Sequence, residues 1–125
     1  MAKGGVKTLL RLEGLAMLAG AAAIYAHSGG DWKLFAVLFL APDLSFLGYI
    51  FGPRAGAAAY NFAHSLIAPT ILGVAALATN AALPLTIALI WVAHIGFDRA
   101  LGYGLKYASG FGDTHLGHIG HAKTA

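Results

Sequence analysis

Several side chains that can bind metal or carry protons lie inside stretches of sequence that are otherwise apolar. Asp43, His64, His94 and Asp98 are the main ones, and the chain contains no cysteine. An ionisable side chain inside a membrane span costs roughly 2.5 to 3.5 kcal/mol on insertion scales, so such residues commonly serve a function. Two imidazoles and two carboxylates form a ligand set that suits a hard or borderline divalent ion. We therefore predict a divalent metal site, with Zn²⁺ or a similar ion bound by these four residues.

Other polar residues near these positions complete the predicted site. A bound divalent ion lowers the pKa of a coordinated water, and a nearby carboxylate can then act as general base. We assign the role of base to Glu13 and a further catalytic role to Asp98. Asn61, Arg99 and His115 are predicted to bind a cofactor or ligand beside the metal.

Helical spacing and depth bring the candidate ligands toward one another. His94 and Asp98 are four residues apart, so they share one face of a helix. At 1.5 Å of rise per residue, Asp43, His64 and His94 each lie about 12 to 14 Å from the cytoplasmic ends of their segments. Pro42 removes a backbone N–H in the same region, which frees a carbonyl group that needs a polar partner. The sequence thus predicts one polar layer in the cytoplasmic half of a membrane domain.

The composition identifies the surroundings of this layer as lipid. The chain has 125 residues, of which 58% are hydrophobic and 10% are charged, and its mean hydropathy is +0.72. Average proteins carry about 25% charged residues, so a soluble fold of this size could not cover so much apolar surface. The eight lysines and arginines are scattered without forming a basic stripe, which argues against nucleic-acid binding.

Four segments are long and apolar enough to cross a membrane, for which about 20 residues are needed. The short connections between them predict an all-α, antiparallel four-helix bundle. We expect a transmembrane domain at residues 1–107 and a short His- and Gly-rich cytoplasmic tail at residues 108–125. The four predicted spans cover about residues 8–27, 32–51, 55–78 and 84–103.

The distribution of positive charge predicts the orientation. Lysine and arginine concentrate in the segments that an even number of spans places on one side, and by the positive-inside rule that side is the cytoplasm. Both termini are therefore expected inside. The residues that carry this prediction are Lys3, Lys7, Arg11, Arg54, Arg99, Lys106 and Lys123.

Five strings of sequence resemble a known bacterial family, domain of unknown function 4260, and the resemblance extends over nearly the whole chain. The resemblance implies a small multi-pass protein of the bacterial inner membrane with no established activity. Every candidate site residue named above lies in one of these strings. They are RLEG from Arg11, FLAPDLSFLGY from Phe39, GPRAGAAAYNFAH from Gly52, HIGFDRALGYGLKY from His94 and GFGDTHLG from Gly110.

Four functions remain open at this point, and whether the protein is an enzyme is one of the open questions. The first is a metal-dependent hydrolase acting on a lipid-like or other small-molecule substrate, with Arg54, Arg99 and Lys106 attracting a phosphate headgroup. The second is a transporter or proton relay, which would require a homo-oligomer of such a short chain. The third is binding of haem b through His64 and His94. The fourth is a structural or assembly subunit of a membrane complex.

Overall fold

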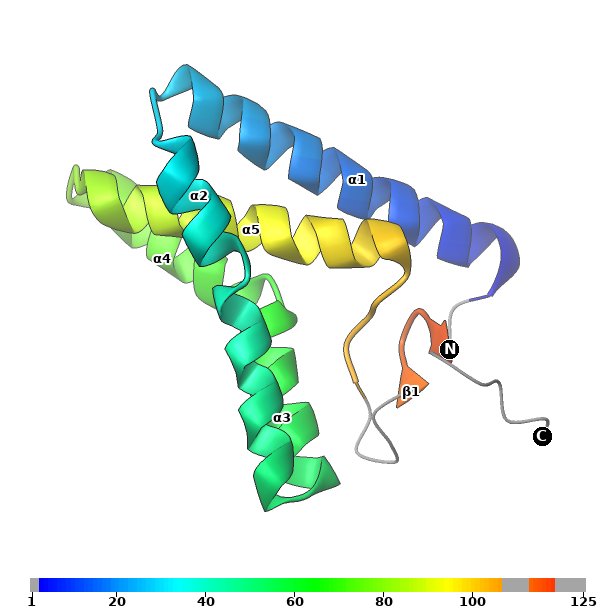
Figure 1. The fold of residues 1–125 in the computed structure, drawn as a ribbon. Helices are drawn as coiled ribbons and strands as arrows, with labels where there is room; N and C mark the ends of the chain where they lie inside the picture. Colours follow the sequence, from blue (N-terminus) through cyan, green and yellow to red (C-terminus); the bar gives the residue numbers. More distant parts are fainter. Residues whose placement is uncertain (1–2, 107–112, 119–125) are drawn as a thin grey trace.

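A computed structural model describes residues 3–106 and 113–118 of the chain. Apart from a small β-hairpin, its regular elements are all helical (Figure 1). The described residues therefore bear out the prediction of an all-helical protein with four apolar helices of membrane-spanning length. These four candidate spans are Gly4–His27, Trp32–Phe51, Pro53–Ala78 and Ala82–Leu101.

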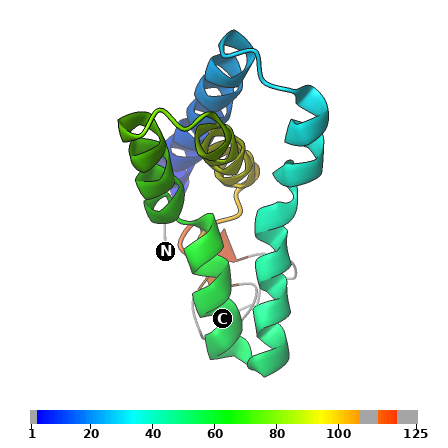
Figure 2. The same ribbon diagram turned by 90° about the vertical axis from the view of Figure 1, so that its left-hand side faces the viewer.

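The first and last spans, α1 (Gly4–His27) and α5 (Ala82–Leu101), lie side by side and antiparallel (Figures 1 and 2). Their backbones approach so closely that a side chain has no room at the crossing. A Cβ atom added at Gly96 would lie 2.6 Å from both the carbonyl oxygen of Gly14 and the backbone nitrogen of Leu18. Small residues allow this kind of close packing between membrane helices, and it fixes the position of α5.

The second span is divided into an α-helix, α2 (Trp32–Phe39), and a 3₁₀-helix, η1 (Ala41–Phe51). Pro42 explains the division, because its ring lacks a backbone N–H and crowds the carbonyl group of the preceding turn. The backbone tightens at this point, where the N–H of Asp43 donates to the carbonyl of Leu40 over 3.0 Å. A 3₁₀-helix of 11 residues is unusually long and commonly marks a functional or strained region.

The third span is also divided, into α3 (Pro53–His64) and α4 (Ile67–Ala78). Ser65 has an extended backbone between them, with φ of −89° and ψ of 158°. Pro69 lies four residues after Ser65, so it cannot donate to the Ser65 carbonyl, and its ring crowds that group. The α-helical hydrogen-bonding pattern therefore stops after α3 and starts again in α4.

These two breaks change the arrangement that was predicted. η1 and α3 pack against each other as a helical hairpin that leaves the body formed by α1, α4 and α5 at a steep angle (Figures 1 and 2). The sequence predicts four continuous helices in one antiparallel bundle, whereas the structure bends the second and third spans. Both bends face α5, and the candidate site lies where they meet it.

A β-hairpin of strands β1 (Asp113–Thr114) and β2 (Gly117–His118) follows α5. An isolated bridge between Lys106 and Thr114 joins the hairpin to the segment that leaves α5. Most of the predicted tail at residues 108–125 lies outside the described residues, so the boundary near residue 107 stays a prediction.

The start of α1 and the β-hairpin lie at the same end of the molecule. A Cβ atom added at Gly117 would lie 3.1 Å from Nζ of Lys7. This proximity fits two ends of the chain on one side of a membrane. Which side that is, and hence the cytoplasmic location of both termini, stays a prediction.

Candidate metal centre

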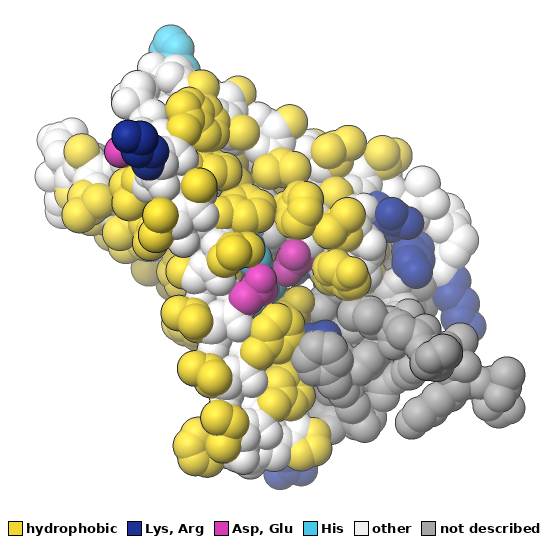
Figure 3. All heavy atoms as spheres, viewed as in Figure 1, with side chains coloured by type: hydrophobic (Ala, Val, Ile, Leu, Met, Phe, Trp, Pro, Cys, Tyr) yellow, Lys and Arg dark blue, Asp and Glu magenta, His cyan; other side chains and the backbone are white. Residues whose placement is uncertain are grey.

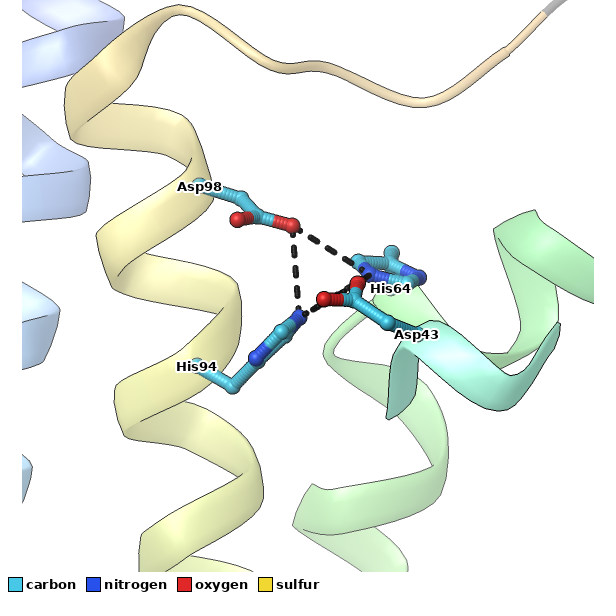
Figure 4. Close-up of side chains that lie close together, drawn as sticks. All are labelled: Asp43, His64, His94 and Asp98. Carbon is cyan, nitrogen blue, oxygen red and sulfur yellow. Dashed lines mark hydrogen bonds and ion pairs between the residues drawn. The ribbon is translucent and has the colours of Figure 1, made fainter. Parts of the chain in front are cut away.

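Four side chains from three helical elements converge on one point, as Figure 4 shows. His64 Nε2 lies 3.2 Å from Asp43 Oδ1 and 3.2 Å from Asp98 Oδ2. His94 Nε2 lies 3.1 Å from Asp43 Oδ1 and 3.3 Å from Asp98 Oδ2, and the two Nε2 atoms are 3.1 Å apart. The predicted convergence of these four residues is confirmed, and it depends on both helix breaks.

Five of the six separations between these ligand atoms match those around a tetrahedral metal ion. Zinc–nitrogen and zinc–oxygen bonds of about 2.0 Å place neighbouring ligand atoms about 3.3 Å apart. One ligand atom from each residue lies within 4.8 Å of all the others, and five of the distances between them are 3.1 to 3.3 Å. The described side chains are thus close enough to hold one ion.

The orientation of His64 is set by a second contact. Its Nδ1 atom lies 3.0 Å from the carbonyl oxygen of Tyr60, so Nδ1–H donates to that carbonyl and Nε2 presents a lone pair to the cluster. Metal-binding histidines are usually oriented in this way. The Tyr60 ring stacks on the imidazole, with centroids 3.8 Å apart and an interplanar angle of 8°. The α3 helix therefore holds His64 in the form that a metal requires.

The cluster is buried on one side and open on the other. The side chains of His64 and His94 are 3% and 1% exposed, whereas those of Asp98 and Asp43 are 14% and 38% exposed. Figure 3 shows acidic side chains at the surface near the junction of α2 and η1, surrounded by hydrophobic side chains. The open side of the cluster thus lies within an apolar surface.

Glu13, predicted as the general base, does not join this cluster. The side chain of Glu13 is exposed, and the neighbouring Gly14 is the buried residue of that turn. The close crossing with α5 requires a residue without a side chain at the contact, so the turn that faces α5 presents Gly14. The two predicted catalytic residues are therefore separated, because Asp98 lies in the cluster and Glu13 lies outside it.

Asn61 and His115, predicted to bind a cofactor, contact the segment that follows α5. Asn61 Nδ2 donates to the Lys106 carbonyl over 2.7 Å, and the Lys106 N–H donates to Asn61 Oδ1 over 2.6 Å. His115 Nδ1 accepts the N–H of Leu105 over 2.8 Å. Both side chains thus satisfy backbone groups of residues 105–106, and neither belongs to the four-residue cluster.

Arg99, the third residue predicted to bind a cofactor, contacts the backbone of a ligand. Its guanidinium group donates to the carbonyl oxygen of His64 over 3.1 Å. That carbonyl lies at the C-terminal end of α3, where helical carbonyls lack partners within the helix. Arg99 therefore ties α5 to the end of α3 directly beside the cluster.

Lys106 and Tyr60 form a stack beside the cluster that the sequence analysis did not predict. Lys106 is 4% exposed, and its ammonium group lies 4.6 Å from the centroid of the Tyr60 ring. Tyr60 is thus placed between Lys106 and His64. Burial lowers the pKa of Lys106, with the nearby Asp98 acting in the opposite direction. The spacing of four residues between Tyr60 and His64 was the one signal in the sequence for this stack.

The chain belongs to the family described as "Domain of unknown function (DUF4260)", which it matches over residues 7–119. This match confirms the resemblance seen in the sequence. The chain matches no curated protein and no solved structure.

Proposed function

We propose that this member of the family of unknown function 4260 is a multi-pass membrane metalloprotein of the bacterial inner membrane, with both termini in the cytoplasm. One divalent ion is held by Asp43, His64, His94 and Asp98. The observation that carries the proposal is the convergence of one ligand atom from each residue within 4.8 Å. Two imidazole nitrogens and two carboxylate oxygens favour Zn²⁺ or a similar ion over Mg²⁺ or Ca²⁺, which prefer all-oxygen sites.

Charge balance gives a physical reason for the ion. The ligand oxygens of Asp43 and Asp98 lie within 4.8 Å of each other, and two carboxylates this close repel when both are ionised. The His64 tautomer set by the Tyr60 carbonyl adds a lone pair that faces both carboxylates. A divalent cation converts these repulsive contacts into binding energy, as bound ions generally do.

The reaction we propose is hydrolysis of a lipid-like substrate. A bound divalent ion acts as a Lewis acid and lowers the pKa of a water molecule. Asp43 is the more exposed carboxylate, and because its Oδ1 atom faces the histidines, its Oδ2 atom is the candidate proton acceptor. Asp43 takes this role in place of Glu13, which lies away from the cluster. The apolar surface around the open side supports entry of the substrate from the bilayer (Figure 3).

The positions of the cationic side chains argue against a substrate with a phosphate headgroup. Arg54 lies in the first turn of α3 and His64 at its end, so about 15 Å of helix separates them. Arg99 donates to the His64 backbone and Lys106 lies over the Tyr60 ring. These positions give little support to the earlier expectation that the three cations jointly bind a phosphate headgroup.

Haem b is a poor fit for the two histidines. Axial ligands lie on opposite faces of the haem plane, and the 3.1 Å between the two Nε2 atoms leaves no room for a macrocycle between them. Haem bound by both histidines would need the hairpin of η1 and α3 to move away from α5.

A transporter or proton relay is the alternative that a specific observation favours. Discontinuous helices that meet at a polar site are a feature of many transporters, and the second and third spans are both interrupted at this cluster. The metal content of the purified protein separates the two functions, because a relay of Asp and His side chains works without a bound ion.

Elemental analysis of the detergent-purified chain tests the proposal. The wild type should retain about one equivalent of a divalent transition metal in chelator-free buffer, and His64→Ala and His94→Ala should lose it. His27→Ala is the matched control, because His27 is exposed at the end of α1. A well-folded wild type with less than about a tenth of an equivalent, a practical limit on site occupancy, would refute the metal site. Hydrolysis of lipid esters that returns with the metal would support the enzymatic function.

A further inference from the structure

An apolar cavity of about 310 Å³ is lined by residues of α2, η1, α3 and α5. Two of its lining residues directly precede ligands in the sequence, Pro42 before Asp43 and Ala63 before His64. The volume falls in the range of about 300 to 1,000 Å³ that is typical of small-molecule sites. The cavity therefore begins beside the cluster.

The face of α5 that carries the two ligands also lines the cavity. Ile87 and Trp91 line it, and they lie on the same helical face as His94 and Asp98 because the spacings are three or four residues. Ile87 lies 11 residues before Asp98, which corresponds to about 16 Å along the helix. The cavity thus extends from beside the cluster toward the N-terminal end of α5.

A buried hydroxyl group lies in the wall of this cavity. Ser45 lines the cavity two residues after the ligand Asp43. Its Oγ atom is buried and has no hydrogen-bond partner among the described residues. An unsatisfied buried hydroxyl is costly and calls for an explanation. A bound ligand with an acceptor atom near the cluster would explain it, because the Ser45 hydroxyl could donate to that atom.

We propose that this cavity binds one fatty acyl chain whose ester carbonyl lies at the metal cluster and accepts a hydrogen bond from Ser45 Oγ. The inference rests on the proposed function, and it narrows the substrate to an acyl ester. Cleavage adds the oxygen of water to the acyl carbon and breaks the bond to the alcohol oxygen. The departing alkoxide takes the proton that Asp43 Oδ2 accepted from water, and the other hydrogen of the water stays with the acyl product, so a fatty acid and an alcohol are released.

Two physical arguments select this ligand. A divalent ion and two ionised carboxylates sum to no net charge, so the centre suits a neutral ester carbonyl better than a phosphate dianion. The medium around the spans is itself made of acyl chains, so moving a chain from lipid to the cavity gains little hydrophobic energy. The affinity must then come from the polar end, at the metal and at Ser45, while the cavity selects the shape of the chain.

The fluorescence of Trp91 reports directly on ligand binding, because Trp91 lines the cavity. The chain has two tryptophans, Trp32 and Trp91, so Trp32→Phe leaves Trp91 as the sole tryptophan. A brominated fatty acid is titrated into the metal-loaded variant in unbrominated detergent. We expect saturable quenching that unbrominated fatty acid reverses and that a bromoalkane of equal length does not reproduce. Trp32 is 51% exposed, so in Trp91→Phe its quenching should rise in proportion to the bromine content of the micelle.

Substitutions at Ser45 test the ligand contact. Ser45→Leu should abolish the saturable quenching by filling the cavity, and Ser45→Ala should weaken it by removing the donor. Ser28→Ala is the matched control, because the Ser28 hydroxyl donates to the Ile24 carbonyl on an exposed face. Trp91 quenching that is never saturable, or that is unchanged in Ser45→Leu, would overturn the proposal.

The metal content of the same samples separates the two proposals. Metal-loaded protein without saturable quenching overturns the acyl-chain site and leaves the metal function standing. Metal-free wild type with saturable quenching refutes the metal function and supports an acyl-chain site whose polar contact is Ser45 alone.

Discussion

The Nε2 atoms of His64 and His94 lie 3.1 Å apart, although the two residues are separated by 30 positions and belong to different helices. Because Nδ1–H of His64 donates to the Tyr60 carbonyl, the Nε2 atom of a neutral His64 presents a lone pair to His94. The carboxylate oxygens of Asp43 and Asp98 face the same two atoms at 3.1 to 3.3 Å. Four groups that all accept hydrogen bonds when deprotonated are thus crowded around one point, which is the arrangement that a cation relieves.

The stack of Tyr60 on His64 should influence the metal affinity. Tyr60→Leu removes the ring that holds the imidazole in place, while the backbone carbonyl that fixes the tautomer remains. Substitutions that disturb the orientation of a ligand typically cost 10- to 100-fold in metal affinity, so we expect a loss of about 10-fold by metal titration. Tyr60→Phe keeps the ring and should bind nearly as the wild type does. Equal affinities for the Leu and Phe variants would show that the stack is irrelevant.

Metal removal should loosen the hairpin of η1 and α3 selectively. This hairpin supplies Asp43 and His64, whereas α5 supplies the other two ligands, so an ion ties the two parts together. A ligand present at about 100 times its Kd stabilises the state that binds it by about 2.7 kcal/mol. Chelation should therefore speed hydrogen exchange in α3, with little change where α1 packs on α5. Asp43→Ala should show the faster exchange even with metal present.

Metal retention should also fall as the pH is lowered. Protons compete with the ion for imidazole nitrogens and carboxylate oxygens, so acidic buffer favours release. Equilibrium dialysis against buffers of decreasing pH measures this directly. Retention that does not change with pH would be inconsistent with histidine and aspartate ligands.

The residues of the cluster could be predicted because their physical cost is visible in the sequence. Asp43, His64, His94 and Asp98 stand out as ionisable groups in apolar segments, and simple helical rise placed the first three at similar depths. Depth along a helix does not say which way a side chain points around it, however. For that reason Glu13 was expected at the cluster, although its side chain is exposed. Its direction follows from the crossing of α1 and α5, which depends on a contact between residues far apart in the chain.

The bends in the second and third spans were harder to predict. Pro42 was recognised as a proline within a span, but membrane helices often continue past proline when neighbours satisfy the freed backbone groups. Pro69 lies in an apolar run, where nothing distinguishes a kink from a complete break. The roles of Asn61 and His115 were missed for a related reason. Their partners are backbone groups of residues 105–106, and backbone groups leave no pattern in a sequence.

Substitution at the α1–α5 crossing should destabilise the fold. A Cβ atom at Gly96 would lie 2.6 Å from two backbone atoms of α1, so Gly96→Ala forces the helices apart. Overpacking of this kind typically costs about 1 to 3 kcal/mol. Gly20→Ala is the matched control on α1, because an added Cβ there meets nothing within 4 Å, and alanine favours helix by up to about 1 kcal/mol. Thermal unfolding in detergent should show opposite shifts, and a neutral Gly96→Ala would refute the tight crossing.

The orientation of the chain in the membrane can be tested independently of the metal. The positive-inside rule predicts that reporter fusions at Gly29 and Asn80 are external and that fusions at Arg54 and Lys123 are internal. Alkaline phosphatase and green fluorescent protein fusions report the two sides. An external C-terminus would contradict the predicted topology.

The segment after α5 should detach when Asn61 is truncated. The Asn61 side chain pairs with both backbone groups of Lys106 over 2.6 and 2.7 Å, so Asn61→Ala leaves a buried N–H and C=O without these partners. Each unsatisfied buried group costs about 1 to 3 kcal/mol, which is enough to favour release of the segment. Limited proteolysis should then cut near residues 102–106 faster than in the wild type. Asn80→Gly is the control, because glycine accommodates the positive φ of 52° at that turn. If metal content is retained while cleavage accelerates, Asn61 anchors the segment without belonging to the metal site. If metal is lost as well, the segment also supports the cluster through Lys106 and Tyr60.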